Sequence, residues 1–395
     1  MKLRVCTQLH TLQAKRVLYR VDYNVETDEK GRVHADERYR IEATIPTLRY
    51  LIRKRAKVII LSHRGRPHGK EDPNLSLKPV AITLGKLLGK PVKMIPLHEG
   101  EGARRHLDRM KPGQVVLLEN LRFHPGEEVS DNTFAHDLAS LGDVFINDAF
   151  GAIHRDSASM TGIPEFLPSY AGLLMDKEVS TLDKFIAKPT KPHFLIMGGA
   201  KAATKLPLIQ KLMPKAERVL VGGVLANTIL KSARQEVGAS IYEKDFVTEG
   251  KVLARHKKVL LPTDCICDDT STKKIESQLK DIESVLKKDA IVDLGMNTVL
   301  EYVSQLRKAK SVLWNGPLGM IEQRQGSHAS EAIAEFIAAR THDGSMKSFI
   351  GGGETVRVFA RLGLLDDVTF ASTGGGALLS FISDRRQPGL LPLVK

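Results

Sequence analysis

Short runs of apolar residues recur along the whole chain, and most of them are followed by small or polar residues. Continuous apolarity, rather than alternation with polar residues, is typical of strands buried on both faces, as in parallel sheets. We therefore predict strands at 17–19, 58–61, 115–118 and 144–146 in the first half, and at 194–197, 219–221, 259–261, 291–292, 312–314 and 349–350 in the second half.

Helical patterns lie between the predicted strands. Apolar residues recur every three or four positions over 41–52 and again over 77–87, which is the spacing of one helix face. Strands that alternate with helices over the whole chain indicate the α/β fold class, with doubly wound parallel sheets.

A chain of 395 residues is too long for one ordinary hydrophobic core, so we expect two domains. A turn-like cluster at 167–172 precedes a helix-like stretch, and we place the joint near residues 168–190 with that helix as the connector. The predicted domains are 1–168 and 169–377. The Pro-containing ending is too short to form a further unit and is expected to pack on one already built.

Composition narrows the function classes. The net charge of +13 favours anionic partners, either phosphorylated small molecules or nucleic acid. Basic residues do not occur in blocks and aromatic residues make up only 5%, so the pattern argues against nucleic acid. No apolar run approaches the roughly 18 residues of a membrane helix, and no signal peptide is visible. Three cysteines, two of them spaced CxC, argue against a disulfide framework or a zinc site. We expect a cytoplasmic protein.

Basic and polar residues follow the predicted strands of the first half. In α/β sheets, ligands bind beyond the carboxyl ends of the strands. There the sequence reads RVDYN from residue 20, SHRGRP from 62, ENLRFH from 119 and NDAFGAIHR from 147. One arginine alone is usually a solvated surface residue, but arginine or histidine at four strand ends predicts a site for a small, highly anionic ligand.

Glycine-rich turns follow the predicted strands of the second half. They read GGAK from residue 198, GG from 222, NGPLG from 315, GGGE from 351 and STGGG from 372. One such turn is weak evidence, because tight turns use glycine routinely. Five of them ahead of helices indicate backbone N–H groups that bind phosphate. None fits the P-loop or the dinucleotide fingerprint, so we predict a nucleotide site of another kind.

These motifs together resemble those of the phosphoglycerate kinase family, in family order from residue 20 to residue 377. The resemblance implies two Rossmann-like domains joined by a helix and hinge, with the tail, residues 378–395, packing back on the N-terminal domain. It also implies reversible phosphoryl transfer from 1,3-bisphosphoglycerate to Mg-ADP, giving 3-phosphoglycerate and ATP in glycolysis and gluconeogenesis. We expect a monomer that binds a phosphometabolite and a nucleotide, with Mg2+ as cofactor.

The resemblance assigns the basic residues of the first half to the phosphoglycerate site. These substrate-binding residues are Asp22, Asn24, Arg40, His63, Arg66, Arg122, His154 and Arg155. Arg40 is chosen over Arg38 as the catalytic arginine because it precedes an isoleucine and lies six residues before a proline.

The resemblance assigns the glycine-rich half to the nucleotide. The nucleotide-binding residues are Gly199, Lys201, Lys205, Gly223, Asn315, Pro317, Glu322, Gly352, Gly353, Glu354, Thr355 and Gly374. Lys201, Gly352 and Gly375 are also assigned, with Arg40, to the transferring phosphoryl group. Glu354 is the magnesium ligand, and Thr355 is expected to begin or cap the following helix.

The residue types suit this chemistry. The carboxylate leaving group of an acyl phosphate needs no proton, and the acceptor oxygen of ADP is already ionised. A general base is therefore unnecessary, and transfer depends on positioning and charge stabilisation. Substrates on separate domains require closure, which would also exclude water.

The sequence departs from the common family pattern at Arg64, Ser157, Thr204, Val224, the segment 293–298 and Glu354. Glu354 replaces the usual aspartate. It remains a hard oxygen ligand, but it is one methylene longer, so the ligand geometry must shift or a water must intervene. We consider three hypotheses: an active kinase first, then a non-catalytic phosphometabolite-binding relative, then a nucleic-acid-binding protein.

Overall fold

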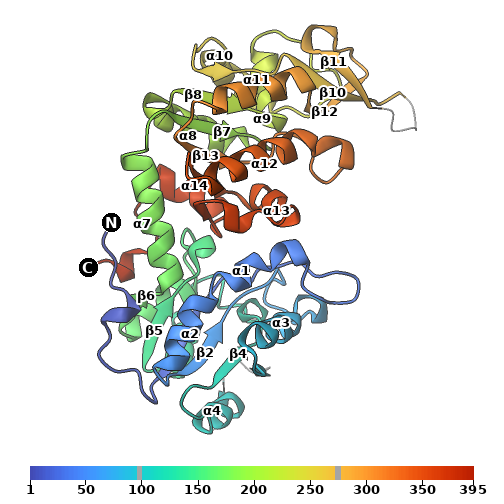
Figure 1. Ribbon diagram of the computed structural model, residues 1–395. Helices are drawn as coiled ribbons and strands as arrows, with labels where there is room; N and C mark the ends of the chain where they lie inside the picture. Colours follow the sequence, from blue (N-terminus) through green and yellow to red (C-terminus); the bar gives the residue numbers. More distant parts are fainter. Residues whose placement is uncertain (96–99, 272–276) are drawn as a thin grey trace. The chain divides into compact units, whose positions relative to one another are not determined.

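The computed structural model describes residues 1–95, 100–271 and 277–395, and the chain divides into two compact units (Figure 1). The first unit contains residues 1–181 and 384–395, and the second contains 182–383. The division falls inside the helix α7 (Leu173–Ala187), whereas the sequence pattern placed the first boundary at residue 168. The segment that returns to the first unit begins at Asp384, where we expected residue 378.

The first unit is built on a six-stranded, all-parallel sheet with the order β3-β4-β2-β1-β5-β6. The strands are β1 (Arg16–Arg20), β2 (Lys57–Leu61), β3 (Lys93–Ile95), β4 (Val115–Leu118), β5 (Val144–Asn147) and β6 (Ser169–Ala171). The chain leaves β1 toward β2 and later returns to its other side as β5. The carboxyl ends of these strands therefore share one edge of the sheet, where this switch in direction favours a ligand site.

Helices cover both faces of this sheet. They are α1 (Tyr39–Glu42), α2 (Ile45–Arg53), α3 (Lys78–Leu88), α4 (Gly100–Asp108), α5 (Asn132–Ala139) and α6 (Ile163–Phe166). Side chains of α1, α2 and α3 join the apolar cluster on one face, and side chains of α4 and α5 join the cluster on the other. The apolar series at 41–52 belongs to two helices rather than one, because Pro46 lies in the first turn of α2 and begins a new helix.

Both ends of the chain pack on the first unit. The Arg4 N–H donates to Leu393 O at 2.8 Å, and Leu3 pairs with Val394 in an isolated bridge. Val5 pairs with Ala171 of β6, and the Gly389 N–H donates to Ile153 O at 2.9 Å. The returning segment 384–395 is thus a part of this unit's fold.

The second unit contains a six-stranded parallel sheet with the order β15-β14-β13-β7-β8-β9. Its strands are β7 (His193–Met197), β8 (Arg218–Val221), β9 (Val259–Leu260), β13 (Ser311–Asn315), β14 (Lys347–Gly351) and β15 (Phe370–Ala371). Its helices are the end of α7, α8 (Ala202–Leu212), α9 (Gly223–Ser232), α10 (Val247–Ala254), α11 (Met296–Leu306), α12 (His328–His342), α13 (Gly353–Arg361) and α14 (Gly376–Ser383). The two parallel sheets confirm the predicted fold class.

A separate three-stranded antiparallel sheet corrects one detail of that prediction. It has the order β11-β10-β12 and contains β10 (Asp264–Asp269), β11 (Ser277–Asp281) and β12 (Asp289–Leu294). The apolar run at 291–292 lies in β12, so it does not belong to the parallel sheet, although a strand was predicted there. In the described ranges, no helix is long and apolar enough to cross a membrane.

Candidate active site

Three arginines of the first unit line one cavity of about 430 Å³ at the carboxyl edge of the sheet. Arg66 follows β2, Arg122 follows β4 and Arg155 follows β5, so each comes from a different strand end. Arg20, at the end of β1, lines the same cavity. The remaining lining residues are His68, Glu127, Glu128, Asp156 and Ser157. The predicted cluster therefore exists as a cavity rich in guanidinium groups, with carboxylates among them.

Arg20 begins the RVDYN motif and is the basic residue at the first of the four predicted strand ends, but the family resemblance did not assign it a role. It is only 1% exposed. Its Nε donates to Ser159 Oγ at 2.8 Å, and its Nη2 lies 3.1 Å from His63 Nδ1. Arg20 also forms an ion pair with Glu127, in which Nη2 lies 3.9 Å from Glu127 Oε1. The sequence placed this arginine at a strand end, but its burial and its partners Ser159, His63 and Glu127 could not be predicted from the sequence.

His63 lies inside the unit rather than at the cavity wall. It is 3% exposed, and burial, reinforced by the neighbouring Arg20 and Arg155, holds its pKa well below the usual range. His63 is therefore a neutral hydrogen-bonding group at physiological pH and adds no positive charge to the cluster. His154, in contrast, is exposed beside Arg155.

Arg40 and Asp22 lie together. Arg40 belongs to α1, and its Nη1 is 3.4 Å from Asp22 Oδ2 while its Nε is 3.4 Å from Glu37 Oε2. Burial opposes the charge, but Tyr39 and the two carboxylates outweigh burial and raise the pKa of Arg40. Arg40 thus keeps its full positive charge, with two carboxylates fixing the direction of its guanidinium.

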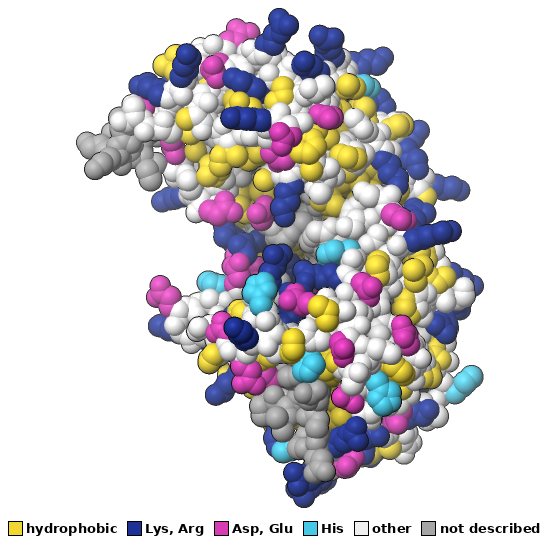
Figure 2. All heavy atoms as spheres, turned by 180° about the vertical axis from the view of Figure 1, so that it is seen from behind, with side chains coloured by type: hydrophobic (Ala, Val, Ile, Leu, Met, Phe, Trp, Pro, Cys, Tyr) yellow, Lys and Arg dark blue, Asp and Glu magenta, His cyan; other side chains and the backbone are white. Residues whose placement is uncertain are grey.

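Two further contacts fix the loops of this site to one another. Asn24 Oδ1 accepts the Gly65 N–H at 2.8 Å, which joins the loop after β1 to the loop after β2. Arg122 is 4% exposed, donates from Nη1 to Gly65 O at 2.6 Å and pairs with Glu128 at 3.2 Å. Arg66 is exposed by comparison and free to reach a ligand. Lys and Arg side chains also spread over the visible surface of both units (Figure 2), so this cavity does not account for the whole net charge of +13.

In the second unit, the glycine-rich loops meet at a cavity of about 260 Å³. The predicted residues that line it are Lys201, Lys205, Asn315, Gly352, Gly353, Glu354, Thr355 and Gly375. They come from the loop after β7 and the start of α8, from the end of β13, from the loop after β14 and the first turn of α13, and from the loop before α14. Gly374 lies one residue outside the lining, with its N–H donating to Ser372 Oγ at 3.0 Å.

The backbone of these loops requires glycine at specific positions. Gly352 has φ +89°, a value that side chains with a Cβ rarely adopt, and a Cβ there would lie 3.1 Å from Asn315 Nδ2. A Cβ on Gly223 would lie 2.7 Å from the Gly199 nitrogen. Because the Gly199 N–H donates to Pro317 O at 2.7 Å, the loops after β7, β8 and β13 approach one another backbone to backbone.

Lys205 is the buried cation of this cavity. It is 6% exposed, and its Nζ donates to Gly198 O. Burial lowers its pKa to about 8, although Glu354 and Glu243 act in the opposite direction. Lys201, at the start of the same helix α8, is exposed.

Asn315 and Thr355 complete the polar lining. Asn315 Nδ2 is buried and has no hydrogen-bond partner among the described residues, so it is a donor available to a ligand oxygen. Thr355 Oγ1 accepts the Gly316 N–H at 2.7 Å. The expectation that Thr355 begins or caps α13 is wrong, because the helix begins at Gly353 with Gly352 as its N-cap and no side-chain cap.

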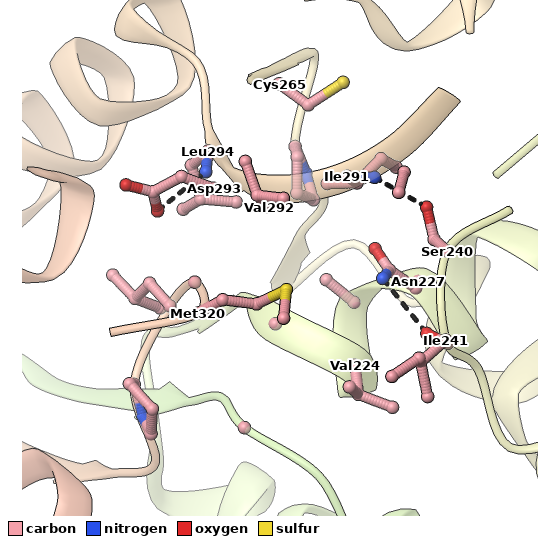
Figure 3. Close-up of a pocket in the computed structure, with 18 of the residues that line it drawn as sticks. Val224, Asn227, Ser240, Ile241, Cys265, Ile291, Val292, Asp293, Leu294 and Met320 are labelled. Atoms are coloured by element: carbon pink, nitrogen blue, oxygen red, sulfur yellow. Dashed lines mark hydrogen bonds between the residues drawn. The ribbon is translucent and has the colours of Figure 1, made fainter. Parts of the chain in front are cut away.

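A largely apolar cavity of about 260 Å³ adjoins these loops (Figure 3). Its lining includes Gly199, Gly223, Pro317, Glu322 and Glu354 of the predicted nucleotide residues. Figure 3 shows Val224, Ile241, Val292 and Met320 around the space. Ser240 and Asn227 are held at its wall, since Ser240 Oγ accepts the Ile291 N–H at 2.8 Å and Asn227 Nδ2 donates to Ile241 O at 3.1 Å.

Sequence reasoning did not find most of this apolar lining. Ile241 and Val292 come from a loop and from the antiparallel sheet, and neither carries a motif. An apolar slot beside a glycine-lined, lysine-bearing cavity suits a flat heterocyclic base next to its phosphates.

Two parallel-sheet units, one with an arginine-rich cavity and one with glycine loops and a buried lysine, define an α/β enzyme of phosphoryl transfer. Comparison with known proteins gives the family: the model of the phosphoglycerate kinase family matches residues 7–385. The chain belongs to the phosphoglycerate kinase family.

Individual relatives cover nearly the whole chain. It is 39% identical over 385 residues to a phosphoglycerate kinase of Coprothermobacter proteolyticus, covering 96% of each chain. It is 41% identical over 387 residues to one of Dictyoglomus turgidum, covering 97% of this chain and 96% of that one. Among solved structures, the phosphoglycerate kinase of Coxiella burnetii is similar with a TM-score of 0.80 at 33% identity, covering 99% of this chain and 98% of that one. The enzyme of Pyrococcus horikoshii gives a TM-score of 0.87 at 29% identity with the same coverage.

Proposed function

We propose that this chain transfers the phosphoryl group of 1,3-bisphosphoglycerate to ADP, giving 3-phosphoglycerate and ATP, and that it also runs in reverse. Membership of the phosphoglycerate kinase family supports the reaction. Two cavities support the assignment of this reaction to residues of this chain. One is lined by four arginines, and the other by glycine loops with two lysines.

The arginine-rich cavity would hold the phosphoglycerate. Its guanidinium groups suit bidentate contacts with phosphate and carboxylate oxygens. Arg122 is fixed by Gly65 and Glu128 before any ligand arrives, so little conformational freedom is lost on binding. Asp22 and Asn24, at the end of β1, would orient the hydroxyl and carboxyl groups of the three-carbon ligand.

The second unit would hold the nucleotide. The apolar slot around Val292 and Met320 would take the base, with Glu322 at the ribose. Lys205, Lys201 and the first turn of α13 would contact the phosphates, because the N-terminus of a helix favours anions. The unpaired Asn315 Nδ2 would donate to a phosphate oxygen.

The residues present fit a magnesium ion that arrives with the nucleotide. The described part of the chain has no group of three or more side chains suited to hold a metal alone. Mg2+ is typically held by one or two carboxylates together with substrate phosphates and waters, and Glu354 is an exposed carboxylate at the mouth of the glycine-lined cavity. When bound, magnesium would neutralise charge on the nucleotide phosphates.

No general base is needed for this transfer, since the leaving carboxylate and the attacking phosphate oxygen are both ionised at neutral pH. Arg40, with its raised pKa, and Lys201 would stabilise the equatorial oxygens of the transferring group. The two substrates are assigned to different units, so the units must approach one another for in-line transfer, and that closure would also exclude water.

The decisive experiment is a coupled assay of ATP-dependent phosphorylation of 3-phosphoglycerate with magnesium. We expect turnover that depends on both substrates. An absence of turnover at millimolar substrate would contradict the proposal. Calorimetric binding without turnover would then indicate a non-catalytic relative, and binding of DNA with steep salt dependence would indicate the nucleic-acid alternative.

The cellular setting and the oligomeric state are also proposals. A glycolytic enzyme of this kind would act in the cytoplasm, and a monomer would suffice because each chain carries both sites. Light scattering coupled to size exclusion would report one chain per particle. A dimer at assay concentration would contradict the monomer.

A further inference from the structure

Arg64 lies between two predicted site residues, His63 and Arg66, but it does not line the arginine-rich cavity among the residues described there. It is 6% exposed. Its side chain donates three hydrogen bonds: Nε to Val25 O at 2.9 Å, Nη1 to Ser76 O at 3.0 Å, and Nη2 to Thr27 Oγ1 at 2.6 Å. All three guanidinium nitrogens of this buried arginine donate to loop residues, and these hydrogen bonds hold the loops in one arrangement.

The backbone of Arg64 is fixed as well. Asn120 Oδ1 accepts the Arg64 N–H at 3.1 Å, and Asn120 Nδ2 donates to Arg64 O at 2.7 Å. Asn120 lies two residues beyond the end of β4 and two residues before Arg122. The side chain of Arg64 therefore reaches out from an anchored main chain, and the loops it contacts are positioned relative to the sheet edge.

One of the contacted loops lies between two of the predicted substrate residues, Asn24 and Arg40. Val25 follows Asn24, whose Oδ1 accepts the Gly65 N–H. Thr27 pairs with Val33 across a short hairpin, in which the Asp28 N–H donates to Arg32 O at 2.8 Å.

Beyond the hairpin, the chain leads to the catalytic candidate. The His34 N–H donates to Glu26 O at 3.1 Å, and the following short helix Ala35–Glu37 brings Glu37 to 3.4 Å from Arg40. Two of the three hydrogen bonds of Arg64, to Val25 and Thr27, thus lie at the base of a segment that carries Asn24 at one end and Arg40 at the other.

The charge of Arg64 is balanced locally rather than directed at the cavity. Burial lowers its pKa, while Glu119 and Asp72 oppose that effect. Glu119 accepts hydrogen bonds from Ser76 Oγ at 2.7 Å and from the Leu77 N–H at 2.8 Å, so it fixes the second loop that the Arg64 side chain contacts, at Ser76.

We propose that Arg64 is a positioning residue for the phosphoglycerate site, which fixes the hairpin 25–34 and thereby sets the positions of Asn24 and Arg40. This inference rests on the proposed function. It assigns to Arg64 no contact with substrate. It predicts that the geometry of its three donors matters, and that its positive charge alone does not.

Four variants test the proposal. Arg64→Met removes the three donors. Arg64→Lys keeps the charge but lacks the planar fork that reaches three acceptors. Thr27→Val removes one acceptor and leaves Arg64 intact. Lys30→Met removes an exposed positive charge from the same hairpin and serves as the control.

The expected result is a rise in KM for 3-phosphoglycerate together with a fall in kcat, because Arg64 positions both Asn24 and Arg40. Arg64→Met should raise KM for 3-phosphoglycerate by about tenfold to 10²-fold, the range that a displacement of about 1 Å can cost. KM for MgATP should remain unchanged, because the nucleotide residues belong to the separate second unit. Arg64→Lys should resemble Arg64→Met, Thr27→Val should show a smaller rise in the same constant, and Lys30→Met should match wild type.

Several outcomes would overturn the inference. They are an unchanged KM for 3-phosphoglycerate in folded Arg64→Met, full rescue by lysine, or an equal rise in both Michaelis constants, as a merely structural role would give. If Arg64→Met does not fold, Thr27→Val decides: an unchanged KM for 3-phosphoglycerate in that variant overturns the proposal.

Failure of the proposed function is distinguishable from failure of this inference. Wild-type protein without turnover contradicts the function itself. Calorimetric titration with 3-phosphoglycerate needs no turnover, and weaker binding by Arg64→Met but not by Lys30→Met would still support the positioning role. Equal binding by these two variants would refute it.

Discussion

The two cavities are suited to anionic ligands by different means. In the first unit the donors are long side chains, and two of them are fixed by partners: Arg40 by Asp22 and Glu37, and Arg122 by Gly65 and Glu128. In the second unit the surface is mostly backbone, and what matters is the absence of side-chain atoms. At Gly352, a Cβ would approach the buried Asn315 amide.

This difference has a physical consequence for sensitivity to change. A site made of guanidinium groups depends on charge and on the carboxylates that orient it, and it stays charged over a wide pH range. A site made of loops depends on the close approach of backbones and on one lysine whose pKa is about 8. Mutation and pH should therefore affect the two substrates separately.

The largest effect is expected from Arg40→Ala. Loss of a donor that acts mainly on the transition state costs about 10²–10³-fold in kcat, whereas binding of 3-phosphoglycerate should weaken only modestly. Steady-state kinetics and calorimetry together check this. Arg38→Ala is the control, because Arg38 is 43% exposed and lies 3.9 Å from Glu42. If Arg38→Ala lost turnover and Arg40→Ala kept it, the catalytic assignment would pass to Arg38.

Glu354→Ala should weaken the use of magnesium-nucleotide while leaving 3-phosphoglycerate binding intact. We expect the magnesium concentration for half-maximal rate to rise by about 10–100-fold, the usual cost of disturbing groups around a metal. Glu354→Asp should retain most of the activity because the carboxylate remains. A magnesium requirement that is unchanged in the alanine variant would exclude Glu354 as the ligand.

Gly352→Ala tests the role of backbone in the second unit. A positive φ costs a residue with a Cβ about 1–2 kcal/mol. The loop of the alanine variant should move to relieve this strain, and the displaced backbone should raise KM for nucleotide by roughly tenfold. Gly363→Ala is a matched control, since Gly363 has φ +71° and nothing within 4 Å of a Cβ. It should lose thermal stability but keep the nucleotide KM. Equal kinetics for the two variants would contradict a specific role for Gly352.

The smallest effect concerns pH. Lys205 is protonated below its pKa of about 8, and phosphate favours the protonated form, so nucleotide affinity is full below that pH and falls as pH rises through it. We expect KM for nucleotide to increase on the order of several-fold between pH 7 and pH 9. KM for 3-phosphoglycerate should stay flat, because its arginines remain charged and His63 is neutral. Lys205→Met should remove the pH dependence of KM for nucleotide. An equal rise with pH in KM for nucleotide and in KM for 3-phosphoglycerate would contradict the proposed difference between the two sites.

The same linkage has the opposite sign for stability. The charged form of Lys205 is disfavoured by burial, so its folded pKa lies below the unfolded value of 10.5. The unfolded state binds more protons between about pH 8 and that value, and Lys205 therefore destabilises the unliganded fold at low pH and ceases to do so as pH rises through this window.

Much of the fold could be predicted because the central strands are continuous apolar runs. The run at 58–61 lies in β2, and the run at 312–314 lies in β13. The strands β10 and β11 escaped detection because DCICDD and SQLKD are largely polar. The antiparallel pairing there depends on tertiary contacts rather than on local hydrophobicity.

Part of the candidate site could also be predicted from the sequence, and part could not. The sequence pattern alone was enough to bring Arg66, Arg122 and Arg155 to one cavity, because each follows the carboxyl end of a parallel strand. The network of Arg20 and the contacts of Arg64 could not be read from the sequence, since both depend on residues far away in the chain. Burial also reversed one expectation, because His63 adds a neutral group where the sequence suggested a basic one.

The segment 384–395 has a consequence for how the molecule is made. It is joined to the opposite end of the chain by Arg4 N–H to Leu393 O and by Lys395 N–H to Lys2 O, yet it follows the whole second unit in the chain. During synthesis, the first unit leaves the ribosome early but lacks these partners until the second unit has been translated. The unit that starts first is therefore completed last, and any truncation before residue 384 leaves it permanently unfinished, with Leu3 and Ile153 lacking their backbone partners Val394 and Gly389.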